Sequence, residues 1–172
     1  AAAGADGGNN TDAGKLFATN GRDDANADAI NKAAKAVSGV SGGQILNAIV
    51  TSGDGNGANA EDATNPIDAA IGNDGNGQGF GENMNTDDKI AAAIVLRGMA
   101  KGGKFALAAG ADNSKESLKA TVESAVSKTI ESLNRLVREA VVTGLKSVAS
   151  TIKAAGNGEN SKVGSGEKKV DK

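Results

Sequence analysis

The glycines and the lysine between residues 98 and 104 come nearest to a catalytic motif in this chain. Gly98, Gly103 and Lys104 match G-x-x-x-x-G-K-[ST] up to its last position. In that motif, backbone N–H groups wrap a phosphate and the lysine reaches it. Phe105, however, stands where the motif has the hydroxyl that binds magnesium, and the residues before it read as a helix rather than a strand. We therefore interpret the segment as a turn between two helices.

A second candidate is the start of a calcium-binding loop. Asp74, Asn76 and Gln78 supply side-chain oxygens on alternate residues, and a glycine follows at the sharp turn. Calcium loops need a bidentate Glu at the twelfth position, where this chain has Asn85. Glu82, at the ninth position, does not replace it. We therefore expect a solvated surface loop.

Three of the charged side chains in the apolar run 85–107 are candidates for chemistry. Asp87 and Asp88 have the pairing of an acid–base site, but no set of polar partners for such chemistry accompanies them. They suit the positive end of a helix dipole, with the Thr86 hydroxyl as cap. Arg97 is less common within an apolar helix. The leading interpretation is a side chain that reaches solvent or pairs with a carboxylate at the edge of the core. A ligand contact is the alternative.

Basic residues also recur along the C-terminal part of the chain. A solvated helix face is the simplest interpretation, and a site for a polyanion such as a glycosaminoglycan is the alternative. Acidic residues at 123, 131 and 139 interrupt the positive charge and favour the simpler reading. The basic positions are Lys128, Arg135, Arg138 and Lys146.

The composition removes several classes of function. The 172 residues include no His, Cys, Trp or Tyr, three Phe, and a net charge of −2. Ser-His and Cys-His nucleophiles and zinc or iron sites with nitrogen or sulfur ligands are excluded. Base stacking and a broad basic surface for nucleic acid are not expected. We therefore predict that the chain is not an enzyme and that it binds no cofactor, no metal and no nucleic acid.

The elements that must position these residues are helices. Apolar residues recur at three- and four-residue spacing in 24–38, after Ser41, after Pro66 and in 114–152, whereas Gly, Asn and Asp dominate 51–64 and 73–84. We predict an all-α fold without a significant sheet. Its parts are a helical region at 1–112 with a central helix at 86–101, a long helix at 113–155, and a disordered tail at 156–172. The long helix carries an apolar stripe, made of Leu118, Val122, Val126, Ile130, Leu133, Val137, Val141, Leu145, Val148 and Ile152.

The segment 85–107 should form the centre of a thin, Ala-rich core, because its helix is apolar nearly all round. Gly102 and Gly103 should end that helix. The residues expected to be buried there are Asp87, Ile90, Ile94, Leu96, Arg97, Met99 and Phe105.

The same segment, DDKIAAAIVLRGMAKGGKFAL, resembles the most constant part of the variable large surface lipoproteins of Borrelia, the VlsE/Vlp family. The resemblance extends to GKLF at 14–17, AVSGVSGGQIL at 36–46, NPI at 65–67, AAIG at 69–72 and ESAV at 123–126. It therefore covers residues 14–155, broken by the polar loops.

The resemblance implies a helical, plasmid-encoded surface protein, lipid-anchored at the bacterial outer membrane. In that family, recombination rewrites stretches of the protein and so evades host antibodies, which would be its partners. The variable stretches would be 18–35, 51–64 and 73–85. The displayed loop residues would be Asp54, Asn56, Asn59, Asp74, Asn76 and Gln78. An adhesin that binds host glycosaminoglycan or matrix is the alternative.

The chain departs from the family in lacking the lipidated N-terminal Cys and the N-terminal helical region. Its opening, AAAGADGGNN, reads like the middle of a longer protein, so we expect a fragment or a processed product. Attachment to a membrane would then come only through a lipid anchor absent from this chain. We expect the stripe at 118–152 to pair with another copy or to be poorly ordered.

Overall fold

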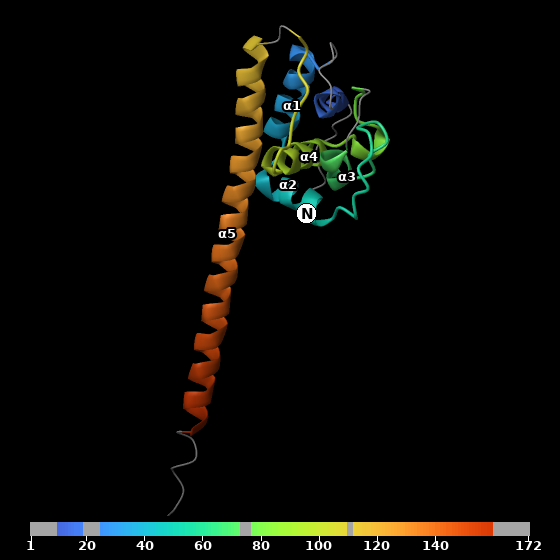
Figure 1. Cartoon of the computed structure of the whole chain (residues 1–172). Coiled ribbons are helices and arrows are strands. Elements are labelled where there is room, and N and C mark those ends of the chain that lie inside the picture. The colour runs from blue at the N-terminus through green and yellow to red at the C-terminus, as the bar shows by residue number, and fades with distance from the viewer. Residues whose placement is uncertain (1–9, 19–24, 73–76, 110–111, 160–172) are drawn as a thin grey trace, which may run out of the picture. The chain divides into compact units, whose positions relative to one another are not determined.

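A computed structural model describes residues 10–18, 25–72, 77–109 and 112–159. Figure 1 shows its helices. No strand occurs in these ranges, so the predicted all-α fold is confirmed there. Of the predicted tail at 156–172, the residues beyond 159 lie outside them. The helices are η1 (Thr11–Phe17), α1 (Ala27–Gly39), α2 (Gly42–Val50), α3 (Pro66–Ile71), η2 (Glu82–Met84), α4 (Asp87–Met99) and α5 (Asp112–Glu159).

The helices begin where side chains satisfy their first N–H groups. Asn26 accepts hydrogen bonds from the backbone of α1, and Ser41 forms a capping box with Gln44 at the start of α2. Asn65 caps α3, and Pro66 occupies its first turn, where a missing N–H costs nothing. The helices expected after Ser41 and Pro66 are thus confirmed as α2 and α3.

The chain divides into two compact units, residues 1–133 and 134–172. In the first unit, α4 packs against η1, α1, α2 and α3 (Figure 1). Its side chains from Ile90 to Val95 are at most 1% exposed, and three consecutive alanines at 91–93 let the neighbouring helices approach closely. The central helix is therefore the element on which the rest of this unit is built.

The C-terminal end of this segment is less buried than predicted. α4 ends at Met99, and Met99 is 59% exposed because it stands in the last turn, beyond the helices that cover the rest of α4. Its predicted burial is wrong. Leu96 and Phe105 are half-buried, whereas Ile90, Ile94, Asp87 and Arg97 are buried.

The first unit also includes the start of α5, which packs through a face that shares only Leu118 with the apolar stripe. Val122 and Val126 of the apolar stripe are only half-buried, and Ile130 is exposed. The buried positions carry mostly small side chains, which allow a closer approach than valine or isoleucine does. A β-carbon on Gly42 of α2, for example, would overlap the carbonyl oxygen of Lys128. The buried residues of this face are Leu118, Thr121, Ala125, Thr129 and Ser132.

The second unit contains the C-terminal part of α5. Its side chains are exposed from 134 to 156, and the apolar ones from Leu136 to Ile152 are 47–66% exposed. The chain is helical here up to Glu159. No helix in the described ranges is long and apolar enough to cross a membrane. Pairing of the stripe with another copy stays a prediction.

Candidate functional site: buried charges that hold loops and helix ends

Arg97, in the last turn of α4, donates five hydrogen bonds. Its guanidinium reaches three segments that lie far apart in the sequence, and every acceptor is a backbone carbonyl. The acceptors are Phe17 (2.6 Å), Ala70 (3.0 Å), Ala69 (3.2 Å), Lys104 (3.4 Å) and Gly72. Arg97 therefore joins the end of η1, the end of α3 and the segment that follows α4.

Arg97 is 5% exposed, and no carboxylate in the described ranges forms an ion pair with it. Burial lowers the pKa of its guanidinium below the usual value. Carbonyls at the C-terminus of α3 carry partial negative charge and replace a counter-ion. The predicted solvent-reaching or carboxylate-paired arginine is therefore wrong, because the backbone supplies the acceptors.

The three phenylalanines of the chain gather at this arginine. The Arg97 guanidinium lies 4.7 Å from the centre of the Phe17 ring, within range of a cation–π interaction. Phe17 meets Phe80 and Phe105 edge to face, with ring centres 5.0 Å and 5.6 Å away. Such pairs add to the stability that burial gives. The aromatic cluster thus meets the guanidinium through Phe17.

At the other end of α4, Asp87 is also a cross-link. Its carboxylate accepts a buried hydrogen bond of 2.8 Å from the side-chain amide of Asn10. The predicted cap by Thr86 is wrong, since the Thr86 hydroxyl makes no capping bond and has no described partner. Asp88 instead accepts from the backbone N–H of Lys89 at 2.9 Å. Both ends of α4 are therefore tied to the N-terminal segment.

Asp68 of α3 has a role that no sequence pattern indicated. One carboxylate oxygen accepts from the backbone N–H groups of Asn56, Gly57 and Ala58 at 2.9–3.1 Å. The other accepts from the backbone N–H and the hydroxyl of Thr64 at 3.1 Å and 3.2 Å. Burial alone would raise the pKa of Asp68, but these hydrogen bonds to the charged form outweigh it and lower the pKa.

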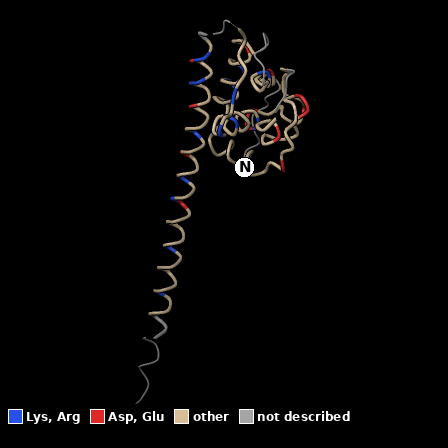
Figure 2. The backbone as a smooth tube through the Cα atoms, in the orientation of Figure 1, with Lys and Arg blue, Asp and Glu red and all other residues tan. Residues whose placement is uncertain are grey.

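Lys128 of α5 also binds backbone groups. Its ammonium donates to the carbonyls of Val37 and Val40 at 2.8 Å and 3.1 Å, at the C-terminal end of α1. A cation is favourable there because it opposes the helix dipole. The predicted solvated role of Lys128 is wrong. Because the Lys128 ammonium already binds these carbonyls, it is less available to a polyanion. Figure 2 also shows acidic residues between the basic positions of α5.

The predicted display residues are mostly found at the surface. Asp54, Asn56 and Gln78 are exposed, and Asn59 is half-buried. Asp74 and Asn76 lie outside the described residues, so the calcium-loop pattern is not described in full. In the described ranges, no group of three or more acidic side chains is arranged to hold a metal ion.

The loop at 98–104 ends α4, as predicted. The second helix that was predicted to follow directly is absent, because residues 103–109 are not helical. Gly102 has a φ of +79°, a conformation that favours glycine. The backbone N–H of Gly103 donates to the carbonyl of Ala100 at 2.9 Å, and the Lys104 side chain is exposed. Its glycines thus close the end of α4.

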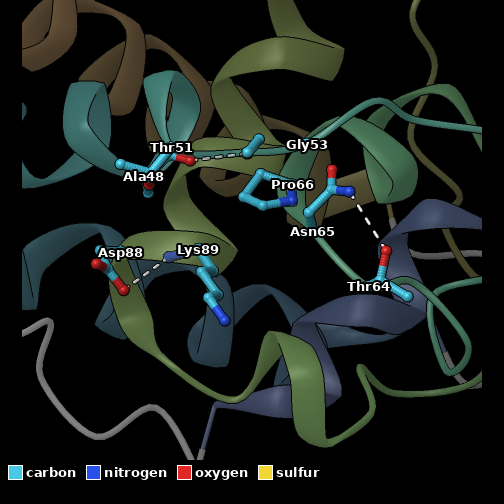
Figure 3. A pocket seen from close by; sticks show the side chains of 9 residues that line it. Ala48, Thr51, Gly53, Thr64, Asn65, Pro66, Asp88 and Lys89 are labelled. Atoms are coloured by element: carbon cyan, nitrogen blue, oxygen red, sulfur yellow. Dashed lines mark hydrogen bonds between the residues drawn. The ribbon is translucent and has the colours of Figure 1, made fainter.

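A polar hollow of about 280 Å³ lies where the end of α2 and the starts of α3 and α4 come together (Figure 3). Its hydroxyls are already bonded, since Thr51 and Ser52 donate to carbonyls of α2 at 2.7 Å. The Lys89 ammonium donates to the carbonyl of Asn83 at 2.7 Å. Figure 3 shows the Asn65 amide directed at Thr64, a hydrogen bond of 3.3 Å. These polar groups serve the local structure and give no acid–base pair.

Known proteins resemble this chain along most of its length. The model of a family described as Borrelia lipoprotein matches residues 1–152. Variable large protein 4 of Borrelia hermsii is 36% identical over 143 residues, which are 80% of this chain and 41% of that protein. Variable large protein 17 of the same organism is 34% identical over 128 residues, or 71% of this chain and 36% of that protein.

A solved structure agrees with these matches. The crystal structure of the Lyme disease variable surface antigen VlsE of Borrelia burgdorferi superposes with a TM-score of 0.82 at 46% identity. The match covers 90% of this chain and 59% of VlsE, so the chain spans less than two thirds of each of these relatives. The resemblance inferred from the sequence is confirmed, and the chain belongs to the Borrelia lipoprotein family.

Proposed function

We propose that this chain is the display region of an antigenically variable surface lipoprotein, whose role is to evade host antibodies. The observation that carries the proposal is the contrast within the first unit between a buried frame and the loops fixed to it. The frame is α4, with side chains at most 1% exposed from Ile90 to Val95. Asp54 and Asn56 of the loop between α2 and α3, and Gln78 of the segment before η2, are exposed.

The physical reason is that exposed loops accept substitutions which a packed helix does not. A side chain that contacts only water can be replaced at a cost within about 0.5 kcal/mol, whereas a change of volume in a core typically costs 1–3 kcal/mol or more. The relatives in Borrelia are named variable large proteins and a variable surface antigen, which supports the same role here. The function would be binding by antibodies rather than catalysis.

The whole protein would be held by lipid at the outer membrane with these loops facing outward. Protease treatment of intact cells tests this, with a periplasmic protein as the control for leakage. We expect loss of the displayed protein while the periplasmic control survives. Complete protection of the protein on intact cells, with digestion after lysis, would overturn the proposal.

A further inference from the structure

The loop between α2 and α3, residues 53–65, is held in one shape by contacts that involve few of its side chains. Four of the five hydrogen bonds to Asp68 come from backbone N–H groups, and the fifth from the Thr64 hydroxyl. The side chain of Asn65 adds a bond to the carbonyl of Asp54 at 3.2 Å. A backbone N–H is present whatever the side chain, except in proline.

The loop also packs closely, in part against α3. Ala60 and Ala63 are buried, at 5% and 0% exposed. A β-carbon on Gly55 would lie 2.7 Å from the Ile67 side chain and 2.9 Å from the backbone nitrogen of Asp68, so the backbone itself touches α3 there. Between these fixed points, the exposed side chains that make no hydrogen bond to Asp68 are those of Asp54, Asn56, Glu61 and Asp62.

From these contacts we infer that Asp68 is a positioning residue that makes residues 53–65 a preformed surface for antibodies, in a shape that survives replacement of its exposed side chains. The inference rests on the proposed function and names the surface concerned. A loop already fixed in its bound shape spares the antibody the cost of ordering it. Antibodies raised against the folded chain should therefore recognise this loop by its conformation.

The position of Asp68 separates this inference from a simple contact role. Asp68 is 5% exposed, so an antibody that binds the loop has almost no access to its carboxylate. Any effect of residue 68 on antibody binding must therefore act through the shape of the loop. Asp28, an exposed carboxylate in the first turn of α1, provides a matched control for the same chemical change.

The binding experiment uses monoclonal antibodies raised against the folded chain and selected because Glu61→Arg abolishes their binding. Their affinity is measured for the wild-type chain, Asp68→Asn, Asp28→Asn and a linear peptide of residues 53–65. We expect a loss of about tenfold or more for Asp68→Asn and for the peptide, since ordering the freed loop costs affinity. Asp28→Asn, and an antibody against residues 134–156 tested on Asp68→Asn, should show no change.

A second measurement needs no variant that might fail to fold. In the wild-type chain, the backbone amide protons of Asn56, Gly57 and Ala58 should titrate together by NMR as Asp68 is protonated, below its ordinary pKa of 3.8. In a chain with Asn56→Ser and Asp62→Ser, the three backbone amide protons should still titrate with Asp68 and should still exchange slowly with solvent. Equal antibody affinity for the linear peptide and the folded chain, or amides that do not titrate, would overturn the inference. Surface exposure on cells is measured independently, so failure of either proposal is distinguishable.

Discussion

Replacing Arg97 by Met should destabilise the first unit more than removal of any exposed charge. Methionine keeps much of the stem that packs beside Phe17 but donates no hydrogen bond. The substitution removes three buried hydrogen bonds, which Arg97 donates to the carbonyls of Phe17, Ala69 and Gly72. Each buried acceptor left without a donor costs about 1–2 kcal/mol here, or roughly 3–6 kcal/mol in all. That is a large part of the 5–15 kcal/mol typical of a folded domain.

Urea unfolding followed by far-UV circular dichroism measures this change, because the chain has no Trp or Tyr for fluorescence. The second unit adds helical signal of its own, so hydrogen exchange of the α4 amides should be measured beside it. Arg97→Lys keeps the charge but has three donors and no planar fork. Its free energy of unfolding should lie between those of the wild type and Arg97→Met. Arg135→Met, at an exposed position on α5, is the control and should stay within about 0.5 kcal/mol of wild type. A loss under about 1 kcal/mol for Arg97→Met would refute the reasoning, because it would mean that water replaces the guanidinium.

Three further predictions follow from the structure. The folded state lowers the pKa of Asp68, so the ionised carboxylate stabilises the fold fully above the ordinary pKa of 3.8. This stabilisation is lost as the pH falls through the pKa of Asp68 in the folded state. The free energy of unfolding of Asp68→Asn should therefore depend less on acid pH than that of the wild type. Gly42→Ala should cost about 1–3 kcal/mol in thermal unfolding, because its β-carbon would overlap the carbonyl of Lys128, whereas Gly144→Ala, with open space around it, should stabilise α5 by about 1 kcal/mol. Val141→Glu should abolish any concentration-dependent association seen by light scattering, and a wild-type chain that stays monomeric at all concentrations would contradict the predicted pairing of the stripe.

The helices were predictable because their signals are local. The capping box of Ser41, the Asn65-Pro66 pair and the alanine run of α4 are all read from neighbouring residues. The buried face of α5 was not predictable from periodicity alone. The apolar stripe that includes Val122 and Ile130 has the stronger pattern, but packing selects the face with small residues such as Ala125, which allows close approach.

The roles of the buried charges were beyond reach of sequence reasoning for a related reason. Arg97 and Asp68 bind backbone carbonyls and N–H groups, which nearly every residue has. No partner residue type therefore marks these contacts in the sequence. Arg97 stands out in the sequence because a charge within an apolar helix is unusual. Asp68 does not, because it is one acidic residue among many in a polar region. Only the path of the chain shows what either of them binds.

Arg97 joins segments that are far apart in the sequence, and this distance affects the rates of folding and unfolding. Its bonds to Phe17, Ala69 and Gly72 close loops of 80, 28 and 25 residues. The entropy cost of closing such loops is met before these contacts form, so the guanidinium finds its acceptors only after η1, α3 and α4 have assembled. A contact that forms this late leaves the folding rate almost unchanged and slows unfolding. Arg97 should thus lengthen the lifetime of the folded state more than it speeds the chain toward it.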